Sequence, residues 1–344
     1  MNLLSYIIRR LLLMILVLFG VTFIVFGVML LLPPGMRVAA FVKSEKITPD
    51  QMNAMIKQYG MDQPAPVQYV HWLENMLQGN FGYSSTASAP VLDAFKQYLP
   101  VTLELVLYTM PLMIIVGIVL GTIGAVRKDE PADHFTRVFA IVGYSLPTFW
   151  LGLLLLMLLY GLLGIFPPGL LSNKLTNVIN SPGYHQYTGI LTLDAILNWR
   201  WPIFLDALYH LFLPVVNLVI IQSATIVRLT RSSMLESLGQ DYIRTATAKG
   251  VDRKTIIRRH ARRNALLPVV TISGVLFATL MGGAVITETI FNRPGIGLWT
   301  ARAAVLLDVP AVMFNALFLG VVFVVINLVV DLIYAYVDPR VRLT

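Results

Sequence analysis

The sequence predicts an all-α polytopic membrane protein with six transmembrane helices. Of its 344 residues, 57% are hydrophobic and only 13% are charged, whereas a soluble domain carries about 25% charged residues. The apolar residues are also gathered into long runs, and a helix needs about 20 apolar residues to cross a bilayer. A soluble fold of this composition would leave much apolar surface in water, so the membrane class is favoured.

Six runs have the length and composition of spanning helices. They cover residues 11–32, 105–126, 138–160, 207–227, 265–287 and 311–330. The first run follows Arg9 and Arg10, as in a signal peptide. It is too long for the apolar part of such a peptide, and the residues LLLPPGM after it are not an A-x-A cleavage site. We therefore interpret it as a retained helix.

The runs divide the chain into four segments. These are an N-terminal transmembrane helix (1–32), an extracytoplasmic helical segment (33–100), a membrane domain of five helices (101–337) and a cytoplasmic tail (338–344). In the second segment Thr48 and Gln51 form a capping-box pattern, and Gly60 is placed to end the helix. Tyr69 and Trp72 are expected at the membrane interface. Another external segment, about 161–206, is rich in Pro, Gly, Asn and Tyr and is expected to be irregular.

The Lys and Arg residues predict the orientation, because short cytoplasmic loops are enriched in them. The external segments 161–206 and 288–310 hold two each, whereas residues 228–264 hold ten. This bias places both termini in the cytoplasm of a plasma (inner) membrane protein. The formal net charge of +8 is then mostly a topology signal. Nucleic-acid binding is disfavoured, because no soluble basic domain carries the charge.

Several kinds of chemistry have no residues to support them. The chain has no cysteine, which excludes disulfides and thiolate chemistry, and its five histidines lack metal-ligand spacing. It has no G-x-x-x-x-G-K-[ST] phosphate loop, so any ATP-driven step belongs to another chain. An ion-coupled secondary transporter would need carboxylates near mid-span, and a membrane enzyme a catalytic cluster at one face. Neither is found in the six runs, and no cofactor is expected.

The stretch DYIRTATAKGVDRKTIIRRHARRN, residues 241–264, lies between the fourth and fifth runs and holds eight Lys and Arg residues. It predicts a short helix ended by Gly250 and a second helix capped by Asp252. A basic hairpin lying on anionic headgroups would explain the charges. It would not explain the small side chains of Ala246 and Ala248, which suit insertion into a groove of a protein partner.

Here the motifs resemble a known family. The segments RTATAKG and RNALLP are similar to the EAA loop of ABC importer permeases. Together with MDQPAPVQYVHWL, SLPTFWLGLLLL, ETIFNRPGIGLW and the terminal DPR, they resemble the dipeptide/oligopeptide permease family, in its first-subunit branch. Three features depart from that pattern. Thr247 stands where Arg is frequent, PPGMRV (33–38) replaces an external PGDP, and segment 161–206 is longer than is typical.

The resemblance implies a type I ABC importer transmembrane fold and a subunit that conducts substrate without hydrolysing ATP. The implied partners are a second homologous permease subunit, two cytoplasmic ATP-binding subunits and an extracytoplasmic substrate-binding protein. The implied cargo is a di- or oligopeptide, with an oligosaccharide or another small solute as the alternative. The coupling loop covers about 241–268. The residues expected in its ATPase-docking helix are Asp241, Tyr242, Ile243, Arg244, Thr245, Ala246, Lys249 and Gly250.

Polar and small residues within the runs are candidates for lining the pathway, because polar groups in a membrane are costly. These are Asn217, Gln222, Gly274, Ala278, Gly282 and Asn315. Hydrogen bonds between helices and close helix packing are the alternative explanations. Four further residues fall at the predicted outer edge, where they would meet cargo or the binding protein or else be solvated. These are Glu104, His210, Glu288 and Asp308.

Overall fold

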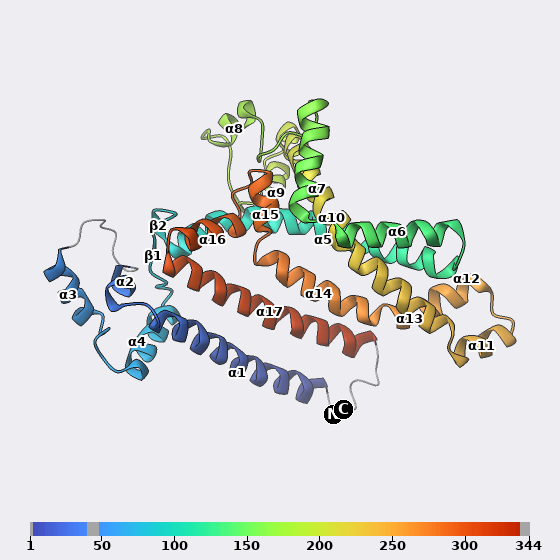
Figure 1. The fold of residues 1–344 in the computed structure, drawn as a ribbon, viewed down its shortest axis with the longest axis horizontal. Helices are drawn as coiled ribbons and strands as arrows, with labels where there is room; N and C mark the ends of the chain where they lie inside the picture. Colours follow the sequence, from blue (N-terminus) through green and yellow to red (C-terminus); the bar gives the residue numbers. More distant parts are fainter. Residues whose placement is uncertain (1–2, 40–47, 338–344) are drawn as a thin grey trace.

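The computed structural model describes residues 3–39 and 48–337 as an almost wholly helical chain (Figure 1). The predicted tail, 338–344, lies outside the described residues. The N-terminal elements are α1 (Leu3–Leu30), α2 (Pro34–Ala39), α3 (Pro49–Gln58), α4 (Ala65–Leu77), β1 (Tyr83–Ser84) and β2 (Ala89–Pro90). The middle elements are α5 (Val91–Val126), α6 (Pro131–Ser145), α7 (Thr148–Leu155), the π-helix η1 (Leu156–Leu162), α8 (Asn173–Ile179), α9 (Leu191–Leu197) and α10 (Trp201–Leu238). The last are α11 (Asp241–Ala248), α12 (Arg253–Thr255), the π-helix η2 (Ile256–Ala261), α13 (Arg262–Ala265), α14 (Leu267–Met281), α15 (Val285–Ile290), α16 (Ile296–Val305) and α17 (Val309–Val337).

Four of these helices, α1, α5, α10 and α17, are long and apolar enough to cross a membrane, and the number rises to six if two bent pairs each count as one span. The bent pairs are Pro131–Ser145 with Thr148–Leu162 and Arg253–Ala265 with Leu267–Met281. The prediction of a six-span, all-α membrane protein therefore fits the structure, with two spans broken.

The third predicted run, 138–160, is not a straight helix. It bends by 102° between α6 and α7. Leu146 there has ψ 128°, the extended conformation imposed on a residue that precedes proline, and Pro147 follows it. The fifth run also ends early, because α14 stops at Met281 and α15 starts only at Val285. Residues 282–287 are thus a turn and a separate short helix.

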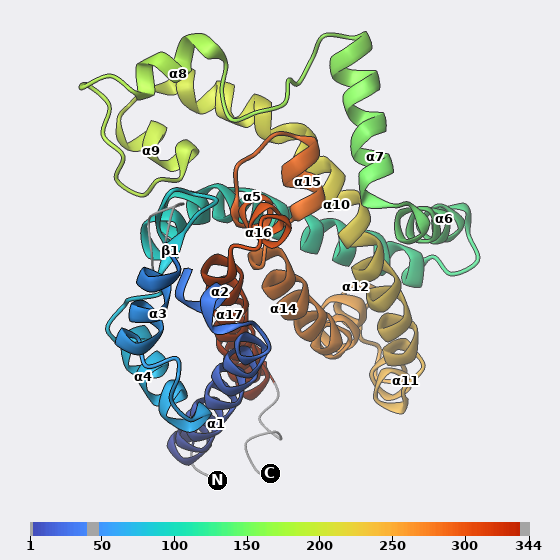
Figure 2. The ribbon, with the colours of Figure 1, turned by 60° about the vertical axis from the view of Figure 1, so that its left-hand side comes forward.

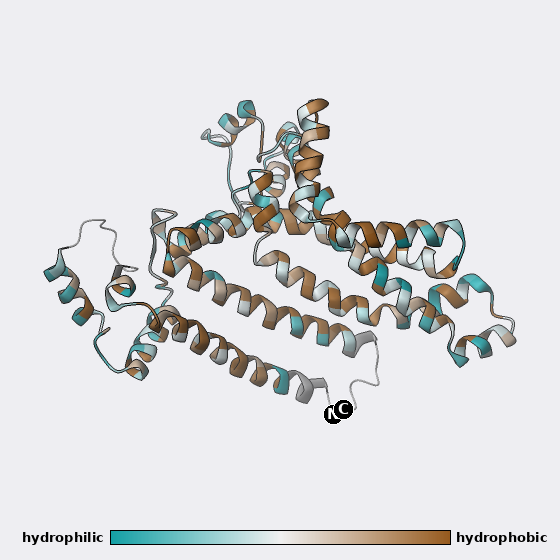
Figure 3. Ribbon diagram, in the orientation of Figure 1, coloured by the Kyte–Doolittle hydropathy of each residue, from teal (hydrophilic) through white to brown (hydrophobic). Residues whose placement is uncertain are grey.

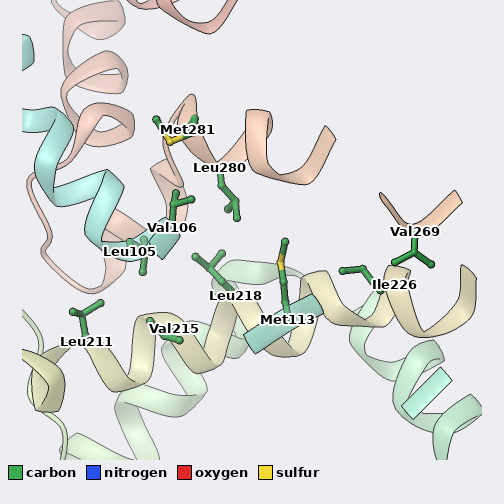
Figure 4. Close-up of a cluster of buried hydrophobic side chains, with 10 residues drawn as sticks. All are labelled: Leu105, Val106, Met113, Leu211, Val215, Leu218, Ile226, Val269, Leu280 and Met281. Atoms are coloured by element: carbon green, nitrogen blue, oxygen red, sulfur yellow. The ribbon is translucent and has the colours of Figure 1, made fainter. Parts of the chain in front are cut away.

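The core forms where α5 crosses α10 and meets α14. Gly117 and Gly121 make this crossing close, because a Cβ on Gly117 would lie 2.3 Å from Ile226 and one on Gly121 2.5 Å from Thr230. Small residues allow such approach in lipid, where packing drives helix association. The apolar side chains at this junction are Leu105, Val106, Met113, Leu211, Val215, Leu218, Ile226, Val269, Leu280 and Met281 (Figure 4).

The two most hydrophilic parts of the described chain, around α3 and around α11 and α12, lie far apart. In Figure 1, α11 and α12 lie at one end of the long axis and α2 and α3 at the other, while α7, α8 and α15 rise from the top. Figure 2 shows α3 and α11 on opposite sides from a second direction. Hydrophobic residues colour α1, α14 and α17 along most of their length, and hydrophilic residues gather on α3 and around α11 and α12 (Figure 3).

The capped helix of the first external segment is confirmed. Gln51 N donates to Thr48 Oγ1, Thr48 N donates to Gln51 Oε1, and Gly60 has φ +63°. Tyr69 of α4 packs edge-to-face and Trp72 at a tilt against Phe26 of α1, with ring centroids 5.3 and 5.6 Å away. These aromatics thus attach α4 to α1.

Segment 161–206 is more ordered than expected. It contains α8 and α9, and Asp194 organises its loop by accepting hydrogen bonds from the backbone N–H of Thr188 and of Gly189, at 2.8 and 2.9 Å. Tyr184 is buried in this layer. Its burial, with the negative charges of Asp194 and Glu104 adding to the effect, raises the pKa of Tyr184 to about 12. The segment is therefore a packed layer over the ends of α5 and α10.

Candidate functional site

The coupling hairpin, defined as residues 241–265, joins α10 to α14. Its first helix, α11, turns Ile243 and Ala246 toward the rest of the chain, where Ile243 is buried and Ala246 half-buried. They pack on a small apolar cluster at the ends of α5, α10 and the second helix of the hairpin. Its buried members besides Ile243 are Ala125, Met234, Ile256, Ala261 and Ala265. This cluster fixes how α11 sits on the spans.

The opposite face of α11 is open. Asp241, Arg244, Thr245 and Ala248 are all exposed, and they share one side of the helix at i, i+3, i+4 and i+7. Asp241 and Arg244 form an exposed ion pair at 3.3 Å. Ala246 was expected to insert into a partner. In this structure it packs inward and the small residue on the outward face is Ala248, while the docking role of the helix stays a prediction.

The turn after α11 has the predicted geometry. Gly250 has φ +78°, a conformation that other residues adopt only with strain. Lys249, just before it, is exposed at the helix end. Asp252 then caps the second helix by accepting a 2.9 Å hydrogen bond from Thr255 N. The hydrogen bonds from Thr255 hold the pKa of the Asp252 carboxyl below its usual value. A rigid, short turn thus sets the angle between the two helices.

The hairpin is tied to three spans. Tyr242 accepts a 3.1 Å hydrogen bond from Asn264 Nδ2, which connects its two helices. Arg253 Nη2 donates to the carbonyl of Val126, the last residue of α5, at 3.2 Å. Because α11 also follows α10 with little intervening chain and α13 leads directly into α14, displacement of α11 would be transmitted to α5, α10 and α14.

Of the polar pathway candidates, Asn217 and Asn315 are buried and Gln222 is partly exposed. Asn217 Nδ2 lies 3.4 Å from Thr287 Oγ1, and its Oδ1 has no partner among the described residues. Neither amide atom of Asn315 has one within the same part of the chain. Buried amides are normally hydrogen-bonded, so Asn217 Oδ1 and both amide atoms of Asn315 are exceptions among the described residues.

The small pathway candidates Gly274 and Gly282 pack against α17. A Cβ on Gly274 would lie 2.6 Å from Val330, and one on Gly282 would lie 2.8 Å from Leu319. Ala278 is fully buried between them along α14. In this structure Gly274 and Gly282 therefore allow close helix packing, which was the alternative explanation for them. Gly274 also borders an apolar groove of ≈ 250 Å³ between α5, α14 and α17, in which Ser273 is the one polar side chain.

The four residues expected at the outer edge are neither solvated nor exposed to a partner in this structure. Their exposed fractions are 1% for Glu104, 4% for His210, 0% for Glu288 and 2% for Asp308. Each is bonded within the chain, so the expectation of surface contacts is corrected. Glu104, Glu288 and Asp308 hold together a layer formed by β1, α9, α15 and α16.

Glu104 is bonded to Arg293, which also contacts a second segment of the chain. Its Nη2 donates to Glu104 Oε2 at 2.6 Å and its Nη1 to the carbonyl of Gly169 at 3.2 Å. Glu104 Oε1 in turn accepts from Thr192 N at 2.8 Å. A single buried ion pair thus joins α5, α9, the segment before α8 and the turn after α15. Sequence reasoning quoted the motif ETIFNRPGIG but assigned Arg293 no role.

Glu288 and Asp308 complete the layer. Glu288 accepts hydrogen bonds from Thr102 Oγ1 and Leu298 N, both at 2.8 Å. Asp308 accepts from Ser84 Oγ at 2.5 Å and so holds β1 beside the start of α17. His210 lies 2.8 Å from the carbonyl oxygen of Asp206, one turn earlier in α10. The acidic residues therefore fasten these elements to one another.

The chain matches known transport proteins over almost its whole length. A family model described as binding-protein-dependent transport system inner membrane component matches residues 94–343, and a model of the N-terminal part of such components matches residues 3–115. The dipeptide transport system permease protein DppB of Escherichia coli (strain K12) is 38% identical over 98% of this chain and 99% of its own. The di/tripeptide transport system permease protein DppB of Pseudomonas aeruginosa (strain UCBPP-PA14) is 39% identical over the same shares. A probable D,D-dipeptide transport system permease protein of Escherichia coli (strain K12) is 38% identical over 95% of this chain and 94% of its own.

Proposed function

The chain belongs to the family of binding-protein-dependent transport system inner membrane components, and from this membership we propose that it is one permease subunit of an ATP-driven importer of small peptides. It forms half of a translocation pathway and couples it to ATPases in the cytoplasm. The observation that carries the coupling role is the outward face of α11, which is exposed and small at Ala248 while its inner face packs on the ends of α5 and α10 and on the second helix of the hairpin.

The proposed partners are a second, homologous permease, two cytoplasmic ATP-binding subunits and an external substrate-binding protein. Asn217 Oδ1 and both amide atoms of Asn315 have no hydrogen-bond partner among the described residues, and together with the apolar groove beside Gly274 they support a pathway completed by a second permease. The chain itself is non-catalytic in this proposal, since ATP hydrolysis is assigned to the ATP-binding subunits.

Small peptides are the proposed cargo, because several relatives of nearly the same length are named as dipeptide or di/tripeptide permeases. Oligosaccharides are the alternative within the same architecture. The test is uptake into proteoliposomes that hold this chain, the second permease, the two ATPases and the binding protein. We expect ATP-dependent uptake of labelled di- or tripeptides. Uptake of an oligosaccharide with no uptake of peptides would overturn the cargo assignment, and uptake without the ATPases would overturn the importer class.

The proposed orientation places both termini and the coupling hairpin in the cytoplasm. Two exposed positions test it: Ser85, beside the external hairpin of β1 and β2, and Lys128, in the loop after α5. The chain has no cysteine, so single substitutions report cleanly. In intact cells Ser85→Cys should react with an impermeant thiol reagent and Lys128→Cys should not. The reverse pattern would show that the chain is inserted the other way round.

A further inference from the structure

Arg37 of α2 is a buried cation without an anionic partner in the described part of the chain. The residue is only 6% exposed. Its Nη1 donates to the side-chain amide oxygen of Gln68 at 2.5 Å, and its Nε has no hydrogen-bond partner among the described residues. Burial lowers the pKa of Arg37. A buried guanidinium normally has an anion beside it, because an unpaired buried charge is costly.

Arg37 lines a small cavity beneath α4, at the external ends of α1 and α17. The other lining residues are Met29, Trp72, Met76, Asn80, Phe81, Val309, Pro310, Met313, Phe314 and Leu317. Four of them, Met76, Phe81, Phe314 and Leu317, also line a second and larger groove. The cationic cavity and the larger groove are therefore adjacent, with these four side chains between them.

The larger groove, of ≈ 580 Å³, runs between α1 and α17 under α4. Its remaining lining residues are Ile15, Leu18, Phe19, Val21, Thr22, Leu73, Leu77, Phe318 and Val321. Thr22 is the one polar side chain among them, and its hydroxyl is already hydrogen-bonded to Tyr69 Oη at 2.8 Å. Because α1 and α17 are membrane-spanning helices, this groove lies at bilayer depth and is apolar throughout.

We propose that this composite site binds one phospholipid of the surrounding bilayer, with its phosphate on Arg37 and an acyl chain in the groove between α1 and α17. The phosphate supplies the anion that Arg37 lacks, in a charge-assisted hydrogen bond. An acyl chain fills the groove without bringing polar atoms into it. A peptide would place backbone N–H and C=O groups there without partners, at a cost of several kcal/mol for each in lipid.

The segment that carries Arg37 is one where this chain departs from its family's pattern. Residues 33–38 read PPGMRV in place of PGDP. None of the residues that line the site belongs to the coupling hairpin, so the site can be tested without the cargo or the ATPases.

The first test counts the phospholipid molecules that stay with the importer complex after purification in detergent, by native mass spectrometry. Arg37→Gln removes the charge, and Leu18→Trp fills the half-exposed groove. We expect about tenfold weaker retention in Arg37→Gln, the size of effect typical for a hydrogen bond to a charged group, and a comparable loss in Leu18→Trp. Arg302→Gln, which removes an exposed arginine, is the matched control and should retain phospholipid like the wild type. Equal retention in wild type and both site variants would overturn the proposal.

The second test separates phospholipid from other occupants. Thermal unfolding is followed with added phospholipid and with glycerol phosphate, which has the same anion without acyl chains. Phospholipid should raise the unfolding temperature of the wild type more than that of Arg37→Gln, and glycerol phosphate should not. An equal rise with both would assign the site to a free anion. A single cysteine at Leu18 should also fail to cross-link to another protein chain in native membranes. A cross-link to the second permease there would assign the groove to a protein interface.

Discussion

Arg293→Met should destabilise the protein more than any single surface substitution. It leaves Glu104 charged and buried, with 1% of the residue exposed and its ion-pair partner gone. Breaking a buried ion pair in this way costs about 3–5 kcal/mol. We therefore expect a marked fall in the temperature at which the detergent-solubilised protein unfolds, together with loosening of the external layer.

The double variant Glu104→Gln/Arg293→Met shows whether the charge itself is responsible. The glutamine side chain introduced by Glu104→Gln would keep an oxygen that can accept the hydrogen bond from Thr192 N, and no charge would remain unpaired. Part of the lost stability should return, because removing both ions is far less costly than removing one. Arg302→Gln is the control, since exposed substitutions usually change stability by less than about 0.5 kcal/mol. If Arg293→Met alone is as stable as Arg302→Gln, the ion pair between Glu104 and Arg293 does not have this structural role.

Ala248→Glu should release the ATPases while leaving the permease intact. Ala248 is exposed on the outward face of α11, so the added carboxylate meets water in the isolated chain but is buried on docking. An unpaired charge buried at an interface costs about 2 kcal/mol or more, which weakens association at least about thirtyfold. We expect loss of co-purified ATPases and of substrate-stimulated ATP hydrolysis, at an unchanged unfolding temperature.

Ala246→Glu places the same side chain on the other face of the same helix. Ala246 packs against the cluster around Met234. This variant should therefore lower the unfolding temperature as well as the substrate-stimulated ATP hydrolysis. Comparison of the two variants separates a docking face from a packing face. If Ala248→Glu retains the ATPases at the wild-type level, the outward face of α11 is not the contact. The basic hairpin would then be a membrane-surface element, as its charges alone suggest.

Local features of the structure were largely predictable from the sequence. The capping box at Thr48, the cap at Asp252 and the left-handed turn at Gly250 depend on a few adjacent residues, and all three are confirmed. The break of the third run was equally local. Pro147 indicates a break in the helix, because proline disrupts a helix interior. A search for apolar runs by hydropathy alone does not detect such a break.

The sequence by itself determined that the chain is a membrane protein, where its long helices lie and which segment is the candidate for docking the ATPases, because run length, turn residues and charge are properties of neighbouring positions. Only the tertiary structure decided which side of α11 is outward and that Glu104 is paired with Arg293, 189 residues away. In a soluble protein a charged residue is expected at the surface. Here Glu104 and Arg293 are buried as a pair, and pairing depends on contacts between distant segments. The proposed role of Arg37 could not be predicted for the same reason, because its surroundings are formed by distant segments, α1, α4 and α17.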